Sequence, residues 1–67
     1  MDNVKANREV RERFRDFLEK KGVRITFIAD KVGCPPGLLS TFKLHEGKLL
    51  WKSTLTALDQ FLRGEGF

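Results

Sequence analysis

Apolar residues in the first third of the chain recur with the period of a helix. Four of them stand at i, i+4, i+7 and i+8 and therefore share one face. They are Val10, Phe14, Phe17 and Leu18. Lys20 and Lys21 are followed by Gly22, and cations in a last turn before a glycine are typical of a helix C-terminus. The pattern predicts a helix over about 4–21, with Glu9–Arg13 and Asp16–Lys20 as favourable i,i+4 pairs.

Three shorter helical patterns follow, and no run alternates like a strand. The second pattern has Thr26 as a candidate cap, and the third opens at Pro35 and Pro36, where a missing N–H costs little. Ser53 is the best candidate cap for the fourth helix, although that helix can begin a few residues earlier. The stripe of the fourth helix is Leu55, Leu58, Phe61 and Leu62. The expected fold is all-α, one domain over 1–67, with helices at about 4–21, 25–32, 35–45 and 52–63.

The spacing of small residues in the middle of the chain predicts how two of these helices pack. Ala29 stands four residues before Gly33. Two helices that cross at roughly 90–120° through a short turn need a small residue where they meet, and the turn often contains a glycine because its φ can be positive. The spacing is that of a helix-turn-helix motif. We expect five side chains to point inward and hold the pair together: Ile28, Val32, Cys34, Leu39 and Phe42.

Composition narrows the classes of protein. Lys and Arg number 13 against 9 Asp and Glu, which gives a net charge of +4. Such a surplus favours polyanions, but ribosomal and membrane-surface domains share it. The hydrophobic fraction of 40% argues against disorder, although a chain of this size buries only a small core. We find neither a membrane span nor a signal peptide and expect a cytoplasmic protein.

Candidate chemistry is sparse. The chain has one cysteine, Cys34, and one histidine, His45, so it predicts no internal disulfide, no zinc site and no other metal or cofactor site. We expect Cys34 to be a buried, inert thiol and His45 to be a cation at a helix C-terminus. No nucleophile, base and stabiliser can be assembled from these residues, so we do not expect an enzyme.

Several short segments, in this order and at this spacing, carry a family resemblance. They are Gly22-Val23, Ile28-Ala29, Val32-Gly33-Cys34, Leu39-Ser40-x-Phe42, Gly47-Lys48 and Leu55-x-x-Leu58-x-x-x-Leu62. Together they resemble the Cro/repressor-type helix-turn-helix family, also called lambda-repressor-like or XRE-type. These are small DNA-binding domains that are common in phage and mobile-element regulators. The resemblance covers nearly the whole chain, with Ala29, Gly33, Leu39 and Phe42 as its structural motif.

The resemblance implies that the third helix lies in the major groove of double-stranded DNA while the second crosses the phosphate backbone. It places Pro35, Pro36, Gly37 and Thr41 toward the bases. Three of these lack a side-chain hydrogen-bonding group, whereas direct readout uses bidentate pairs from Arg, Gln or Asn. The implied DNA-binding residues, phosphate contacts included, are Arg24, Thr26, Lys31, Pro36, Gly37, Ser40, Thr41, Lys43 and Lys48.

Two interpretations remain open. The first is a DNA-binding transcriptional regulator such as a repressor, acting alone or as a homodimer. The second is a protein-interaction module, for example an antirepressor, which presents Pro36, Gly37 and Leu38 to a partner regulator. Three aromatic residues, Phe27, Trp51 and Phe67, either close the small core or form a partner or dimer surface. We expect the arginines of the first helix, Arg8, Arg11 and Arg15, to be a solvated face.

Overall fold

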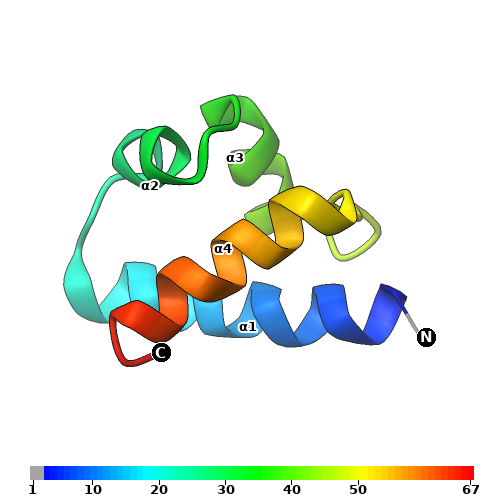
Figure 1. Ribbon diagram of the computed structural model, residues 1–67, viewed down its shortest axis with the longest axis horizontal. Coiled ribbons are helices and arrows are strands. Elements are labelled where there is room, and N and C mark those ends of the chain that lie inside the picture. Colours follow the sequence, from blue (N-terminus) through cyan, green and yellow to red (C-terminus); the bar gives the residue numbers. More distant parts are fainter. Residues whose placement is uncertain (1–2) are drawn as a thin grey trace.

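Four helices account for most of the chain (Figure 1). The computed structural model describes residues 3–67, and no strand occurs within that range. The helices are α1 (Asn3–Lys21), α2 (Ile25–Val32), α3 (Pro36–Leu44) and α4 (Lys52–Gly64). The predicted all-α class is confirmed, and each helix bound lies within one residue of its expected place. None of these helices, over the described residues, combines the length and apolarity that a membrane crossing needs.

The helices pack as two layers joined by α4. α1 contacts α3 and α4, and α2 contacts α3 and α4. Figure 1 shows α2 and α3 on one side of the molecule and α1 along the other, with α4 crossing between them. The molecule measures 30 × 23 × 19 Å. The core is formed by Val10, Phe14, Phe17, Ile28, Ala29, Leu39, Phe42, Leu50, Leu55, Leu58 and Leu62.

The connection from α2 to α3 has the backbone conformation that its glycine predicts. Three residues, 33–35, separate the helices, and Gly33 has φ 83° and ψ 37°, in the left-handed region. The N–H groups of Gly33 and Cys34 both donate to the carbonyl oxygen of Ala29, at 2.8 and 3.0 Å. These bonds satisfy a carbonyl at the end of α2 and turn the chain sharply into α3.

Substitution of this glycine tests the turn. A Cβ on Gly33 would meet nothing within 4 Å, so Gly33→Ala costs backbone strain alone, about 1–2 kcal/mol. Gly37 is the matched control, because it also has open space around it but its φ is not positive. We expect Gly37→Ala to leave stability unchanged or raise it by up to about 1 kcal/mol. Urea titrations followed by circular dichroism compare the two variants, and equal stabilities would contradict a strained turn.

The predicted helix caps are wrong. The N-caps of α2 and α4 are Arg24 and Trp51, and neither makes a side-chain cap hydrogen bond. Thr26 and Ser53 therefore lie inside the first turns of α2 and α4. Ser and Thr are favoured at the N-cap but do not determine its position when packing of the helix fixes where the chain enters.

Two polar side chains of α1 are buried, and they hold the α3–α4 connection. The Oδ1 atom of Asn7 accepts a hydrogen bond of 2.8 Å from the N–H of Leu50. Arg11, only 2% exposed, donates from Nε to the carbonyl oxygen of Phe42 at 2.8 Å and from Nη2 to that of Lys48 at 2.5 Å. Its guanidinium also lies 4.6 Å from the centre of the Phe42 ring.

The expectation of a solvated arginine face on α1 is thus wrong for Arg11 and incomplete for Arg15. Arg15 is half-buried, and its Nε donates to the carbonyl oxygen of Lys43 at 2.7 Å. Arg8 is exposed, as predicted. The carbonyls that these arginines bind lie at the end of α3 and just beyond it, where helix carbonyls lack internal donors and cations are favoured.

The segment after α4 folds back onto α1. The Phe67 ring packs edge-on against Phe17 with ring centres 5.3 Å apart, and Phe61 packs on the same ring at 5.5 Å. Arg13 donates to the carbonyl oxygen of Phe67 at 2.6 Å and pairs with Asp59. The predicted Glu9–Arg13 pair is therefore replaced by a pair between helices, whereas the predicted Asp16–Lys20 pair forms, at 3.3 Å.

Candidate nucleic-acid interface

The N-terminal tip of α3 is exposed to solvent. Pro35, which caps α3, and Pro36 and Gly37, in its first turn, are all exposed. Pro35 has φ −63° and ψ 137°, an extended conformation that directs the chain away from the turn before the helix begins. The tip is consequently a small surface with no bulky side chain, at the end of the helix where the partial charge of the backbone is positive.

The polar side chains that follow the tip offer limited hydrogen bonding. Ser40 is half-buried and Thr41 is exposed. The hydroxyl of Thr41 donates to the carbonyl oxygen of Gly37 at 3.0 Å. Because its proton is used within the helix, Thr41 presents mainly an acceptor oxygen and a methyl group to a ligand.

Two basic residues stand on the outer side of α2. Arg24 and Lys31, near its two ends, are exposed, and Thr26 is exposed between them. The Nζ atom of Lys31 lies 5.4 Å from the centre of the Phe27 ring. Within residues 3–67 neither Arg24 nor Lys31 belongs to an ion pair. Both charges are therefore available to an anionic ligand.

The two other predicted cations lie at the opposite end of α3. Lys43 and Lys48 are half-buried, and it is their backbone carbonyls that bind the arginines of α1. Glu46, an acid close to them in sequence, has its carboxylate 3.0 Å from Nη2 of Arg15 and 3.8 Å from Nε of Arg11. Because α1 neutralises this acid, the basic residues around α3 keep their excess of positive charge.

Three of the four residues of the predicted structural motif are buried beneath this surface, and the fourth, Gly33, is exposed in the turn. Ala29, Leu39 and Phe42 are at most 1% exposed. Val32 and Cys34, expected to be fully inward, are half-buried against the core. Partial burial raises the pKa of the Cys34 thiol, which favours the unreactive protonated form. His45 is the C-cap of α3 and is exposed.

The α2–α3 surface is the name we give to the exposed and half-exposed predicted residues on these two helices. It consists of Arg24, Thr26, Lys31, Pro36, Gly37, Ser40 and Thr41. Several cations of the other two helices, Arg11, Arg13 and Arg63, contact carbonyl oxygens or acids of the same chain. Arg8 of α1 and Lys52 of α4 are exposed and belong to no ion pair within residues 3–67, so unpaired positive charge is present on the α2–α3 surface without being confined to it.

The three aromatic residues predicted as a partner surface have different environments. Trp51 is 82% exposed and Phe27 is 47% exposed, whereas Phe67 is half-buried on Phe17. The sequence interpretation did not single out Leu44 or Leu49, which are 67% and 42% exposed. A signal for them exists, since Leu44 is the last residue of α3 and Leu49 stands in the connection to α4, both outside any apolar stripe.

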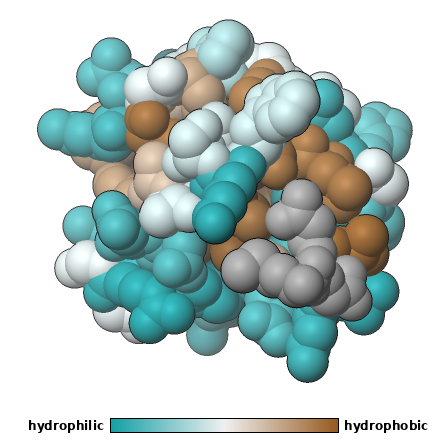
Figure 2. Space-filling view, turned by 45° about the vertical axis from the view of Figure 1, so that its right-hand side comes forward, coloured by the Kyte–Doolittle hydropathy of each residue, from teal (hydrophilic) through white to brown (hydrophobic). Residues whose placement is uncertain are grey.

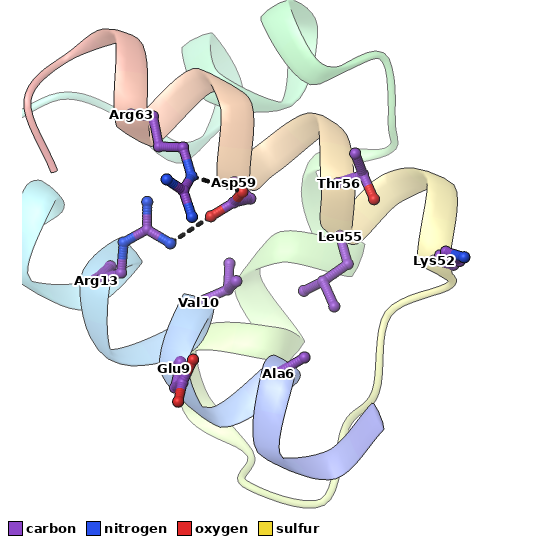
Figure 3. Close-up of a pocket in the computed structure, with 9 residues that line it drawn as sticks. All are labelled: Ala6, Glu9, Val10, Arg13, Lys52, Leu55, Thr56, Asp59 and Arg63. Atoms are coloured by element: carbon purple, nitrogen blue, oxygen red, sulfur yellow. Dashed lines mark hydrogen bonds and ion pairs between the residues drawn. The ribbon is translucent and has the colours of Figure 1, made fainter. Parts of the chain in front are cut away.

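A hollow between α1 and α4 is a second candidate site (Figure 3). Its cavity volume is about 270 Å³, and it is lined by Ala6, Glu9, Val10, Arg13, Lys52, Leu55, Thr56, Asp59 and Arg63. Arg13 and Arg63 both bind the carboxylate of Asp59, Arg63 at 2.9 Å. The hydrogen bond from Arg13 is the main cause that lowers the pKa of Asp59. These charges satisfy one another, and the hollow contains no histidine or cysteine.

Acid titration tests the Arg13–Asp59–Arg63 cluster. The pKa of Asp59 is lowered in the folded state, so the unfolded state binds more protons at pH values between its folded-state and unfolded-state pKa. The stabilisation is therefore present above the unfolded-state pKa and is lost as the pH falls through the folded-state pKa. We expect wild-type stability to drop below about pH 4, by up to about 1 kcal/mol from this partly exposed group. Asp59→Asn should lose that part of the drop, and an unchanged pH profile of urea midpoints in this variant would contradict the assignment.

Within residues 3–67 no group of three or more His, Cys, Asp and Glu side chains is placed to hold a metal ion. Comparison of the chain with models of protein families, with curated proteins and with solved structures gives no match.

Proposed function

We propose that this protein is a small DNA-binding transcriptional regulator of the Cro/repressor-type helix-turn-helix kind. In this proposal α3 enters the major groove with its N-terminal tip and α2 crosses the phosphate backbone. The observation that supports it best is the exposed tip of α3 beside two exposed cations of α2, Arg24 and Lys31, which pair with no acid in the described chain.

The proposed contacts are of two kinds, phosphate contacts that position the protein on the DNA and base contacts that recognise its sequence. Arg24 and Lys31, with Lys43 and Lys48, neutralise phosphates and fix the orientation of the protein. The tip, with Thr41, touches base edges but lacks the bidentate groups that discriminate strongly between base pairs. Sequence preference then comes from short contacts and DNA shape, and a homodimer on half-sites roughly 34 Å apart would double it.

The alternative is a protein-interaction module on the same scaffold, such as an antirepressor. The observation that favours it is the same tip, since Pro36 and Gly37 are exposed and carry no polar side-chain group. Leu38, which this alternative also presents to a partner, is half-buried against the core. The apolar surface left at the tip is therefore small, and we rank this function second.

Selection of duplexes from a random pool, followed by titration of labelled DNA, tests the proposal. With about four phosphates neutralised, log K should fall against log salt with a slope of roughly −4, which means a loss of roughly 150- to 250-fold between about 50 and 200 mM salt. Lys31→Ala and Arg24→Ser should each reduce the slope by about 1. Serine is favoured at the N-cap that Arg24 occupies, so Arg24→Ser does not weaken the fold.

Lys20→Ala is the matched control, because Lys20 is a cation of α1 already paired with Asp16. This variant should leave the slope unchanged. Thr41→Ala should weaken the preferred duplex more than a random one. If the pool yields no preferred duplex and Lys43→Glu leaves the residual binding unaltered, the regulator is excluded and the interaction module takes its place.

A further inference from the structure

An exposed apolar surface lies at the end of α3 opposite its tip. It shares no residue with the α2–α3 surface, although Lys48, a proposed phosphate contact, borders it in the sequence. Its members are Leu49 and Trp51, which are 42% and 82% exposed, together with Leu50 and Lys52, which line the same hollow; we call it the Trp51 surface. In Figure 2, which brings forward the end of the molecule with the α3–α4 connection, hydrophobic side chains gather in a patch on the right-hand side. Single exposed apolar residues are ordinary, but a cluster in a small protein marks an interaction site.

We propose that the Trp51 surface docks an acidic segment of a partner protein that inserts an apolar side chain. The surface contains a hollow of about 350 Å³ lined by Leu49, Leu50, Trp51 and Lys52. Leu50 is 2% exposed, and its N–H is bound to Asn7. The floor of the hollow is thus fixed before any partner arrives, which lowers the entropy cost of binding.

The charges at this surface select the partner. Lys48 and Lys52 flank Leu49 and Trp51 in the sequence, and Lys52 lines the hollow. Glu46, the acid of the same connection, is engaged by Arg15. A second copy of this chain in a symmetric contact would bring these lysines against themselves, whereas an acidic segment would complement them.

The side chains at the hollow favour a protein segment over a nucleic acid. Bases stack on an exposed Trp, but Leu49 and Leu50, which also line the hollow, offer them neither stacking nor hydrogen bonds. An aliphatic or aromatic anchor from a peptide buries against Leu49 and the indole of Trp51, and Trp is enriched among the residues that dominate binding energy. The surface therefore matches a helix or extended segment with apolar anchors between acids.

Trp51 reports on its own surface, because the chain contains one Trp and no Tyr. The probe is a synthetic amphipathic peptide with Leu at i, i+3, i+4 and i+7 and with Asp or Glu elsewhere; the control peptide has Lys in place of each acid. We expect the acidic peptide to shift Trp51 emission to shorter wavelength and to protect it from iodide quenching. The Lys peptide should bind at least about tenfold more weakly.

Variants locate the contact, with a labelled peptide and fluorescence anisotropy as the readout. Trp51→Ser should weaken the acidic peptide by about tenfold or more, and serine suits the N-cap that Trp51 occupies. Leu49→Ser and Lys52→Glu should also weaken it. Gln60→Ala and Lys20→Glu, both exposed positions elsewhere, should not change the affinity. Circular dichroism confirms that each variant is folded.

Four outcomes overturn this proposal. The first is that the acidic and Lys peptides bind equally well. The second is that Trp51→Ser and Leu49→Ser leave the affinity for the acidic peptide unchanged. The third is that the same emission shift appears without peptide as the protein concentration rises, and that sedimentation velocity then detects dimers. This result would assign the surface to a second copy of the chain. The fourth is that phosphatidylserine vesicles or a single-stranded oligonucleotide protect Trp51 from iodide quenching better than the acidic peptide does. Lys31→Ala in duplex titrations tests the DNA-binding proposal separately, so either proposal can fail alone.

Discussion

Replacing Arg11 with alanine is expected to lower the free energy of unfolding by about 3–5 kcal/mol. The guanidinium of Arg11 satisfies two backbone carbonyls, those of Phe42 and Lys48, and lies over the Phe42 ring. The side chain is 2% exposed. Its removal leaves both carbonyls without their donor and opens a large cavity, at a cost of about 3–5 kcal/mol. A chain of 67 residues has a total stability of only about 3–10 kcal/mol.

Urea titration followed by far-ultraviolet circular dichroism measures this loss. Arg8→Ala is the matched control, since Arg8 is an exposed arginine on the same helix, and its effect should stay within about 0.5 kcal/mol. Arg11→Met should fall between the two, because methionine fills the volume but supplies no donor. If Arg11→Ala stays within about 1 kcal/mol of the wild-type protein, the hydrogen bonds of the guanidinium do not hold the α3–α4 connection.

The helices could be predicted because each rests on local rules. The stripe Val10, Phe14 and Phe17 has the helical period and is buried. Gly33 follows from the need for positive φ, which its φ of 83° meets. Such signals depend on a few neighbouring residues, so they do not change with the tertiary packing of the rest of the chain.

The buried arginine could not be read from hydrophobicity. Asn7, Arg11 and Arg15 stand at i, i+4 and i+8 and form a polar row beside the apolar stripe of α1. Mixed charge usually marks a solvated face, but here the row faces the end of α3 and the loop after it. Which carbonyls need donors depends on where α3 ends in space, and that is decided by tertiary packing.

The candidate site could be predicted only in part, because the exposure of its side chains depends on local helical position whereas their contacts depend on tertiary packing. The exposure of Thr41 follows from its helical position, two residues from buried Leu39 and so on the opposite side of α3. Arg24 and Lys31 stand three and four residues from exposed Phe27 and share its side of the chain. The hydrogen bond from Thr41 to Gly37 and the neutralisation of Glu46 by α1 depend on three-dimensional distances that no spacing encodes. Likewise, Leu44 at the end of α3 and Leu49 in the connection are exposed because the chain leaves the core after Phe42 and returns to it only at Leu50.

Enlarging Ala29 is expected to weaken DNA binding by more than its loss of stability explains, because it changes the position of α3. Ala29 is 1% exposed within the core, on an α2 helix that contacts both α3 and α4. Leucine at this position has no room, and overpacking costs about 1–3 kcal/mol, occasionally more. Because helix packing relieves such a clash by moving one element, we expect α3 to shift away from α2 in Ala29→Leu.

Ala29→Gly is the matched control, because it costs a comparable amount, about 1 kcal/mol, through helix propensity while leaving the space open. Urea midpoints should fall in both variants. Duplex affinity, measured where each variant is folded, should fall by about tenfold or more in Ala29→Leu, because loss of even one base or phosphate contact is worth about 1–3 kcal/mol. Ala29→Gly should retain wild-type affinity. If both variants bind the selected duplex equally well, the position of α3 against α2 does not determine recognition, and DNA binding must be assigned to another surface.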